Sequence, residues 1–377
     1  MPIDRRTLLA AGAAAGALAA LKRVEAASAP GTSELYDRAI VIDGCGGPGD
    51  STSDADHPLS DSVVRDAMNS GVTCVNLTVG PVGVASDSAA FEGIVRDIAF
   101  WGEEFDRRPD AFLKVRKFSD VAQARASRRL GVAFGLQDGV SFGSDLTRLK
   151  VLHQLGVRII QPTYNGRNLI GDGCLEPSDA GLSRIGRDAV ARMDELKILV
   201  DLSHCGRATT RDAIAASAKP VAFTHTGCAA VADHPRNKTD EALRALAKKG
   251  GVAGIYFMPY LRKSGQQKAS DVIAHLEHAI DVAGEDHVGI GTDGTISKVE
   301  LTPEYLKFFR DSIAARKAAG ISAPGELEEV YTFAPDLNTP RRLETLAGLL
   351  TARGHSSSRV EKILGGNFAR LFHEVWA

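Results

Sequence analysis

The sequence predicts an α/β protein built as a distorted (β/α)8 barrel, in a single domain that is preceded by a cleavable export signal. Eight short apolar segments rich in β-branched residues alternate with amphipathic helical segments. Parallel barrel strands are buried on both faces, so they read as nearly continuous apolar runs. Polar side chains follow most of these runs, as expected where barrel strands deliver residues to an active site.

The eight predicted strands are distributed along residues 39–294. In chain order they are AIVIDGC, VTCVNLTVG, VAFGLQDG, VRIIQPTYN, ILVDLSHCG, PVAFTHTG, GVAGIYF and HVGIGTDG. A doubly wound sheet is the alternative arrangement of such segments. We favour the barrel because no glycine-rich phosphate loop follows the first strand.

Several helices have readable ends. Ser183 is expected to cap a helix that buries one apolar stripe, and Thr239 to cap another that ends near Gly250. His275 and His278 lie three residues apart on a later helix, and we expect both to face solvent. The segments 50–62 and 295–345 are expected to cover the barrel as loops and extra helices. The domain therefore spans residues 30–377.

The first 29 residues are typical of a signal peptide. Arg5 and Arg6 precede the apolar stretch 8–21, and small residues at 27–29 match a cleavage site. This pattern indicates twin-arginine export and a periplasmic or otherwise exported protein. A membrane anchor is the alternative, but fourteen weakly apolar residues are too few to span a bilayer of about 30 Å. No integral membrane span is expected after signal removal.

Composition narrows the class of function. The 377 residues carry a formal net charge of -2, and loss of four positive and two negative charges with the signal leaves -4. This charge argues against nucleic-acid binding, which depends on neutralising phosphates. Five scattered cysteines do not form a disulfide framework, although a Cys205–Cys228 pair stays open.

Candidate site residues stand at the ends of the predicted strands. They are Cys45, Gln137, Tyr164, Asn165, His204, His225 and Asp293. Two histidines that end neighbouring strands, about 5 Å apart, can bind one metal ion, although hydrogen bonding to loops is the simpler alternative. Asp293 is either a general base, a further ligand or a turn residue.

Five segments carry a resemblance to a known family. They are GLSRIGRDAVARMDELKILVDLSH, PVAFTHTGCAAVADHPRN, GGVAG, HLEHAIDVAGEDHVGIGTDG and ILGGNFARLF. Together, in this order and spacing, they resemble the membrane (renal) dipeptidase family of the amidohydrolase superfamily, over residues 40–376. The resemblance implies a homodimeric binuclear zinc peptidase that acts on small amides.

Residue by residue, the resemblance is incomplete. His204, His225, Asp293 and Arg236 match two metal ligands, the proton-transfer aspartate and the arginine that holds the substrate. Cys45 and Gly47 replace the first histidine and aspartate ligands, Gln137 the bridging glutamate, and Tyr164 a substrate-binding histidine. A neutral amide cannot bridge two divalent cations as a carboxylate does, so one zinc ion or none is expected.

Three functions stay open from the sequence. The favoured one is an exported hydrolase of a dipeptide-like substrate with a carboxylate. In it His204, His225 and Cys45 bind zinc, Asp293 and Tyr164 act catalytically, and Arg236, Asn165 and Gln137 contact a small-molecule substrate. The second is a metal-independent lyase or isomerase that uses the same acid–base residues. The third is a non-catalytic ligand-binding protein.

Overall fold

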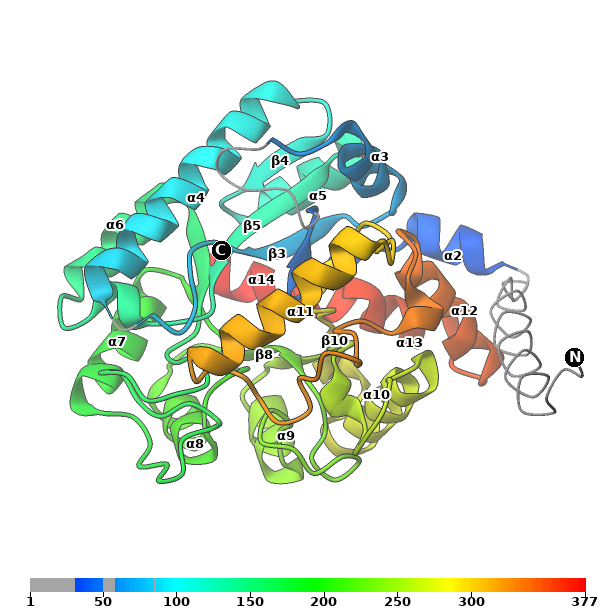
Figure 1. Ribbon diagram of the computed structural model, residues 1–377. Helices are drawn as coiled ribbons and strands as arrows, with labels where there is room; N and C mark the ends of the chain where they lie inside the picture. The colour runs from blue at the N-terminus through cyan, green and yellow to red at the C-terminus, as the bar shows by residue number, and fades with distance from the viewer. Residues whose placement is uncertain (1–30, 50–57, 85) are drawn as a thin grey trace, which may run out of the picture.

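The computed structural model describes residues 31–49, 58–84 and 86–377 (Figure 1). The predicted signal peptide of residues 1–29 and most of the segment 50–62 lie outside the described residues. Within those ranges, no helix combines the length and apolar character needed to cross a membrane.

All eight predicted strands are present, and they pair in parallel in one curved sheet. The strands are β1 (Ile42–Asp43), β3 (Cys74–Thr78), β5 (Leu130–Leu136), β6 (Val157–Ile160), β7 (Leu199–Val200), β8 (Ala222–Thr226), β9 (Val252–Ile255) and β10 (Val288–Ile290). Their order is β7-β6-β5-β3-β1-β10-β9-β8. One parallel bridge, Asp201 to Ala222, joins the two edge strands. The sheet therefore curves back on itself, and its pairing is weakest between β7 and β8.

Three short strands were not predicted from the sequence. β4 (Phe112–Val115) pairs with the first half of β5, beside the place where β6 pairs with the second half. β2 (Gly46–Gly47) and β11 (Gly294–Thr295) pair with each other just beyond β1 and β10. This small ladder fixes the chain segments that leave the first and last strands of the sheet.

Helices alternate with the strands along the chain and surround the sheet (Figure 1). Those up to β10 are α2 (Thr32–Arg38), α3 (Asp61–Asn69), α4 (Asp87–Arg107), α5 (Phe118–Ser127), α6 (Thr147–Leu155), α7 (Arg184–Glu195), α8 (Arg207–Ala216), α9 (Asp240–Lys248) and α10 (Ala269–Ala283). The predicted caps are confirmed: Ser183 accepts a hydrogen bond from Gly186 N, and Thr239 accepts one from Ala242 N.

The expectation that His275 faces solvent is wrong. This side chain on α10 is fully buried, where it accepts a hydrogen bond from Cys228 N at 2.8 Å and contacts Leu261 O at 2.9 Å. His278 is half-buried and contacts Asp240. The buried N–H of Cys228 and the buried carbonyl of Leu261 each need a hydrogen-bond partner, and the imidazole of His275 supplies one to both.

The amino-terminal end of the sheet is filled by the last helix. α12 (Arg342–Ala352) and α13 (Ser357–Glu361) lead through a kinked segment to α14 (Asn367–Trp376). A buried cluster combines one residue from each of several strands with α14; it includes Ile42, Cys74, Ala133, Ile159, Leu199, Ala222, Val252, Phe368, Phe372 and Trp376. The opposite end of the sheet is thereby left for polar residues.

The carboxyl-terminal end of the sheet lies under α11 (Pro303–Ala318), which crosses it in the foreground of Figure 1. Tyr305, Phe309 and Arg316 of this helix line a cavity together with residues from the strand ends. The prediction that residues 295–345 cover the barrel is confirmed, and α11 forms one wall of the candidate site.

Candidate active site

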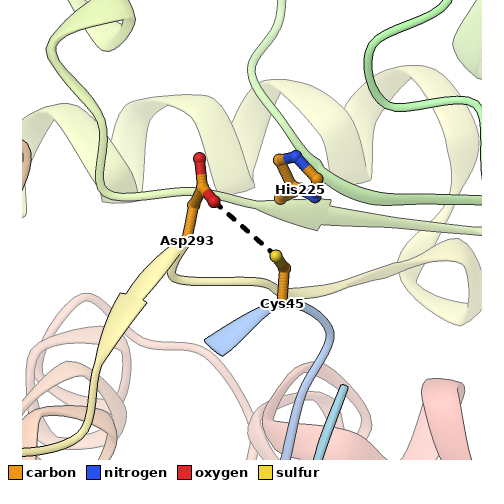
Figure 2. Close-up of side chains that lie close together, drawn as sticks. All are labelled: Cys45, His225 and Asp293. Atoms are coloured by element: carbon orange, nitrogen blue, oxygen red, sulfur yellow. Dashed lines mark hydrogen bonds between the residues drawn. The ribbon is translucent and has the colours of Figure 1, made fainter. Parts of the chain in front are cut away.

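Cys45, His225 and Asp293 come together at the carboxyl ends of three strands (Figure 2). The three side chains offer ligand atoms that all lie within 4.8 Å of one another. The Cys45 thiol donates to Asp293 Oδ1 at 3.6 Å, and the Asp293 N–H donates to Cys45 O at 2.7 Å. Asp293 has a φ of 56°, a left-handed conformation that is rare outside glycine and concentrated at functional sites.

The imidazole of His225 is held in one tautomer. The Thr224 hydroxyl donates to Asp201 Oδ2 at 2.5 Å, so its oxygen accepts from His225 Nδ1 at 2.9 Å. The lone pair is therefore on Nε2, which is buried without a hydrogen-bond partner among the described residues. Burial also lowers the pKa of His225. A neutral imidazole with an orphaned nitrogen next to a thiol and a carboxylate is well suited to bind a cation.

His204 lies beside this group with both ring nitrogens engaged. The Arg236 guanidinium donates from Nη2 to His204 Nε2 at 3.0 Å, and His204 Nδ1 therefore donates to Asn165 Oδ1 at 2.7 Å. Burial, followed by the positive charge of Arg236, lowers the pKa of His204 well below its ordinary value. Of the two predicted histidine ligands, only His225 belongs to the group of possible metal ligands that also contains Cys45 and Asp293.

Gln137 holds the Cys45 sulfur. Its amide donates to Cys45 Sγ at 3.4 Å and to Thr78 Oγ1 at 2.9 Å. Burial, followed by the negative charges of Asp293 and Asp43, raises the pKa of the Cys45 thiol well above its ordinary value. The thiol is accordingly neutral in the absence of a compensating positive charge.

The space for a side chain at position 47 is taken. A Cβ atom on Gly47 would lie 2.4 Å from Leu77 Cδ1. A side chain at position 47 would therefore have to displace the end of the Leu77 side chain. Among the described residues, Cys45, His225 and Asp293 form the one group of three or more His, Cys, Asp or Glu side chains that could hold a metal ion.

A cavity of about 490 Å³ opens next to this group, and its lining contains the predicted residues Gln137, Tyr164, Asn165, His204, Arg236 and Asp293. The Tyr164 ring stacks on His204, with centroids 4.1 Å apart. The sequence therefore identified the strand-end residues of this lining, whereas α11 and the loops contribute most of the others. Whether Arg236, Asn165 and Gln137 contact a substrate stays a prediction.

The sequence analysis missed the residues that α11 and the following loop contribute. Arg316 donates to Glu326 through Nε at 2.7 Å and through Nη2 at 2.9 Å, and Nη2 also donates to the Tyr164 hydroxyl at 3.2 Å. No spacing or strand-end pattern marks these residues, because they reach the site only through the packing of a covering helix. Thr78 also lines the cavity, and its position at the end of the second predicted strand could have identified it as a candidate.

The remaining cysteines lie outside the ligand group. All five cysteines are free, so the Cys205–Cys228 disulfide that the sequence left open is absent. The Cys205 sulfur accepts from Thr163 Oγ1, and the Cys228 thiol donates to His275 O.

Imidazole, thiol and carboxylate groups at the carboxyl ends of parallel strands lie where barrel enzymes place their active sites. A family model described as membrane dipeptidase (peptidase family M19) matches residues 56–303. The chain belongs to the membrane dipeptidase family, as its motifs indicated.

Individual relatives agree with this assignment. The chain is 34% identical to dipeptidase verJ of Clonostachys rogersoniana over 50% of its own length and 49% of that protein's. It is 28% identical to dipeptidase tcpJ of Claviceps purpurea (strain 20.1) over 71% of its length and 56% of that protein's. It therefore spans about half the length of these curated relatives.

Solved structures cover nearly the whole chain. An amidohydrolase from Pseudomonas aeruginosa superposes with a TM-score of 0.77 and 30% identity, over 92% of this chain and 99% of that one. A metallopeptidase from Rhodobacter sphaeroides, liganded with a phosphinate mimic of the dipeptide L-Ala-D-Ala, has a TM-score of 0.70 at 21% identity, covering 90% of this chain and 100% of that one. This second likeness shows the shared fold.

Proposed function

We propose that this protein is a hydrolase of small, dipeptide-like amides that bear a carboxylate, with a single zinc ion in place of a binuclear site. The orphaned, lone-pair-bearing Nε2 of His225, beside Cys45 and Asp293, is the observation that carries the proposal. Membership of a metallopeptidase family supports it. Thiolate, imidazole and carboxylate are the three ligand types that zinc accepts, and three protein ligands are enough for a catalytic site.

In this proposal the ligands are Cys45, His225 and Asp293. The bound ion would lower the pKa of a water molecule and polarise the substrate carbonyl. His204 instead stays within the wall of the cavity, because Arg236 and Asn165 already use both of its ring nitrogens. Its predicted role changes from ligand to a neutral support on which Tyr164 stacks.

The chain's own groups would manage the substrate and the proton. Asp293 is half-buried and borders the cavity, so the carboxylate oxygen that does not bind the ion could accept a proton from the side open to substrate. The amide of Gln137 lines the same cavity and holds the Cys45 sulfur in place, since its two N–H groups donate to Cys45 Sγ and Thr78 Oγ1.

The ligand assignment makes His225 and His204 a matched pair of tests. We expect His225→Ala to lose zinc, measured by elemental analysis after dialysis, and to lose hydrolysis of a dipeptide panel by at least about a hundredfold, since even loss of an outer-shell partner costs about ten- to a hundredfold. His204→Ala should retain its zinc although its activity falls. Two zinc ions per chain, or zinc retained in His225→Ala, would contradict the assignment.

Removal of the metal separates this function from the metal-independent alternatives. Dialysis against a chelator should abolish dipeptide hydrolysis, and one equivalent of Zn²⁺ should restore it. Full activity in zinc-free protein would instead favour the lyase or isomerase that uses the same residues.

We also propose export, supported by the twin-arginine pattern at residues 5–6, and a homodimer by analogy with the family. Replacement of Arg5 and Arg6 by lysine should retain the precursor in the cytoplasm, measured by fractionation and by the mass of the chain. Light scattering of the mature protein measures its oligomeric state.

A further inference from the structure

The arginine expected to bind a substrate carboxylate is buried and already donates to two partners within the protein. Arg236 is 1% exposed, donates from Nη1 to Ser203 O at 2.6 Å, and donates from Nη2 to His204. A ligand that took the Nη2 donor would deprive His204 of the group that fixes its tautomer. The two contacts of Arg236 thus place it to position His204.

A second guanidinium lines the same cavity. The side chain of Arg316, on α11, is 27% exposed, and its Nη1 has no hydrogen-bond partner in the parts of the chain that the structure describes. Glu326 fixes the other edge of the guanidinium through two hydrogen bonds. The free edge of Arg316 is thus held in one orientation beside the cavity.

Glu326 is committed to this support. Its carboxylate also accepts from the Tyr260 hydroxyl at 2.5 Å, from Ser322 Oγ at 3.0 Å and from Ala323 N at 3.1 Å. The side chain is 2% exposed. With five donors on two oxygens, the carboxylate is not available to a ligand, and its charge is matched by Arg316.

Tyr164 places a second donor next to Arg316. Its hydroxyl oxygen accepts from Arg316 Nη2, so the phenolic proton is free to donate, and within the described residues it has no acceptor. The ring is fixed by stacking on His204. Two unsatisfied donors therefore border one cavity, next to the ligand group of Cys45, His225 and Asp293.

We propose that Arg316 and the Tyr164 hydroxyl bind the carboxylate of the substrate, and that Arg236 acts as a positioning residue for His204. This inference rests on the proposed function, since it specifies how a carboxylate-bearing amide is recognised. The covering helix α11 thereby determines specificity, and amides without an anionic end are poor ligands.

The test compares two probes that cannot be hydrolysed. One is an alanyl-alanine analogue whose peptide carbonyl is replaced by CH₂, and the other is its C-terminal carboxamide. Calorimetry on the zinc-loaded protein measures the Kd of each. We expect the wild type to bind the acid at least about tenfold more tightly than the carboxamide, the range for a charged hydrogen-bonded pair.

The variants are chosen so that folding is preserved. Arg316→Gln is made together with Glu326→Gln, because Glu326 would otherwise be left buried and unpaired. Circular dichroism confirms that each variant is folded. This double variant should lose the preference for the acid, whereas Glu326→Gln alone should retain most of it. Tyr164→Phe, which keeps the ring on His204, should reduce the preference severalfold.

Arg236→Gln provides the contrast. It should weaken the acid and the carboxamide to the same extent, so that the preference for the acid is kept. The inference is overturned if the Arg316→Gln, Glu326→Gln variant keeps the wild-type preference, or if the wild type does not prefer the acid. Failure of the proposed hydrolysis would leave these binding measurements intact, so the two failures are distinguishable.

Discussion

His204 and His225 end neighbouring strands in similar sequence contexts, yet their environments assign them different chemistry. Thr224 and Asp201 fix the His225 proton on Nδ1 and leave Nε2 open, whereas Arg236 occupies Nε2 of His204. Which nitrogen carries the proton depends on the partner of the other nitrogen. The residue type alone therefore predicts a pair of ligands, and the hydrogen bonds separate them.

Gly47 gives a prediction at the residue scale. Gly47→Asp should lower the free energy of unfolding by about 1–2 kcal/mol, because its Cβ would overlap the Leu77 side chain at 2.4 Å. The second change Leu77→Ala should restore part of this stability when both are present. Urea denaturation measures the three variants.

The same series tests the metal site. In Gly47→Asp with Cys45→His we expect one zinc ion or fewer, because Leu77 fills the place of the added carboxylate and Gln137 still cannot bridge two cations. A stoichiometry of two zinc ions in that variant would show that the residues at 45 and 47 were the sole obstacle to a second ion.

At the scale of elements, α10 shows how a helix can bury a titratable group to join its neighbours. His275 accepts from Cys228 N after β8 and contacts Leu261 O in the segment after β9. Burial lowers the pKa of His275 to about 4 from an ordinary 6.5. The folded protein therefore binds this proton only in acid, whereas the unfolded chain binds it near pH 6.5.

This difference predicts the sign of a pH effect. The contribution of His275 is complete above pH 6.5 and is lost as the pH falls toward 4, at a cost of roughly 3 kcal/mol in the free energy of unfolding. His275→Gln should flatten this part of the profile, measured by urea denaturation at several pH values. His278→Gln, on the same helix, is the control. An unchanged slope in His275→Gln would show that other groups cause the acid sensitivity.

Across the whole molecule, the two ends of the curved sheet have opposite roles. α14 fills the amino-terminal end with aromatic side chains, and α11 covers the carboxyl-terminal end above the polar residues. The buried cluster that α14 forms with the strands is apolar and close-packed, and it holds the strand ends in register. The other end keeps a cavity in which side chains from distant strands meet.

The buried cluster around α14 predicts a large effect on stability from a substitution far from the candidate site. Phe372→Ala should lower the free energy of unfolding by about 3–5 kcal/mol, because a fully buried ring packed against Phe368 and Trp376 would leave a cavity. Chemical denaturation measures the loss, and Phe372→Leu should retain most of the stability. A change below about 1 kcal/mol in Phe372→Ala would show that α14 does not support the sheet.

Local pattern was enough to predict the eight strands, the caps at Ser183 and Thr239, and the family. These features depend on neighbouring residues, since burial on both faces dictates composition and a cap needs only the next turn. The same logic found Cys45, His225 and Asp293, because the ends of parallel strands meet at one edge.

Tertiary structure decided what local pattern could not. Arg316 and Glu326 reach the cavity from a covering helix and a loop, His275 is buried by contacts with two other segments, and His204 is removed from the ligand group by Arg236. Each depends on which side chains share a hydrogen bond across long sequence separations. The sequence by itself therefore determined the fold, the family and the candidate residues at the strand ends, whereas packing determined which histidine nitrogen lacks a hydrogen-bond partner and which side chains of the covering helix reach the cavity.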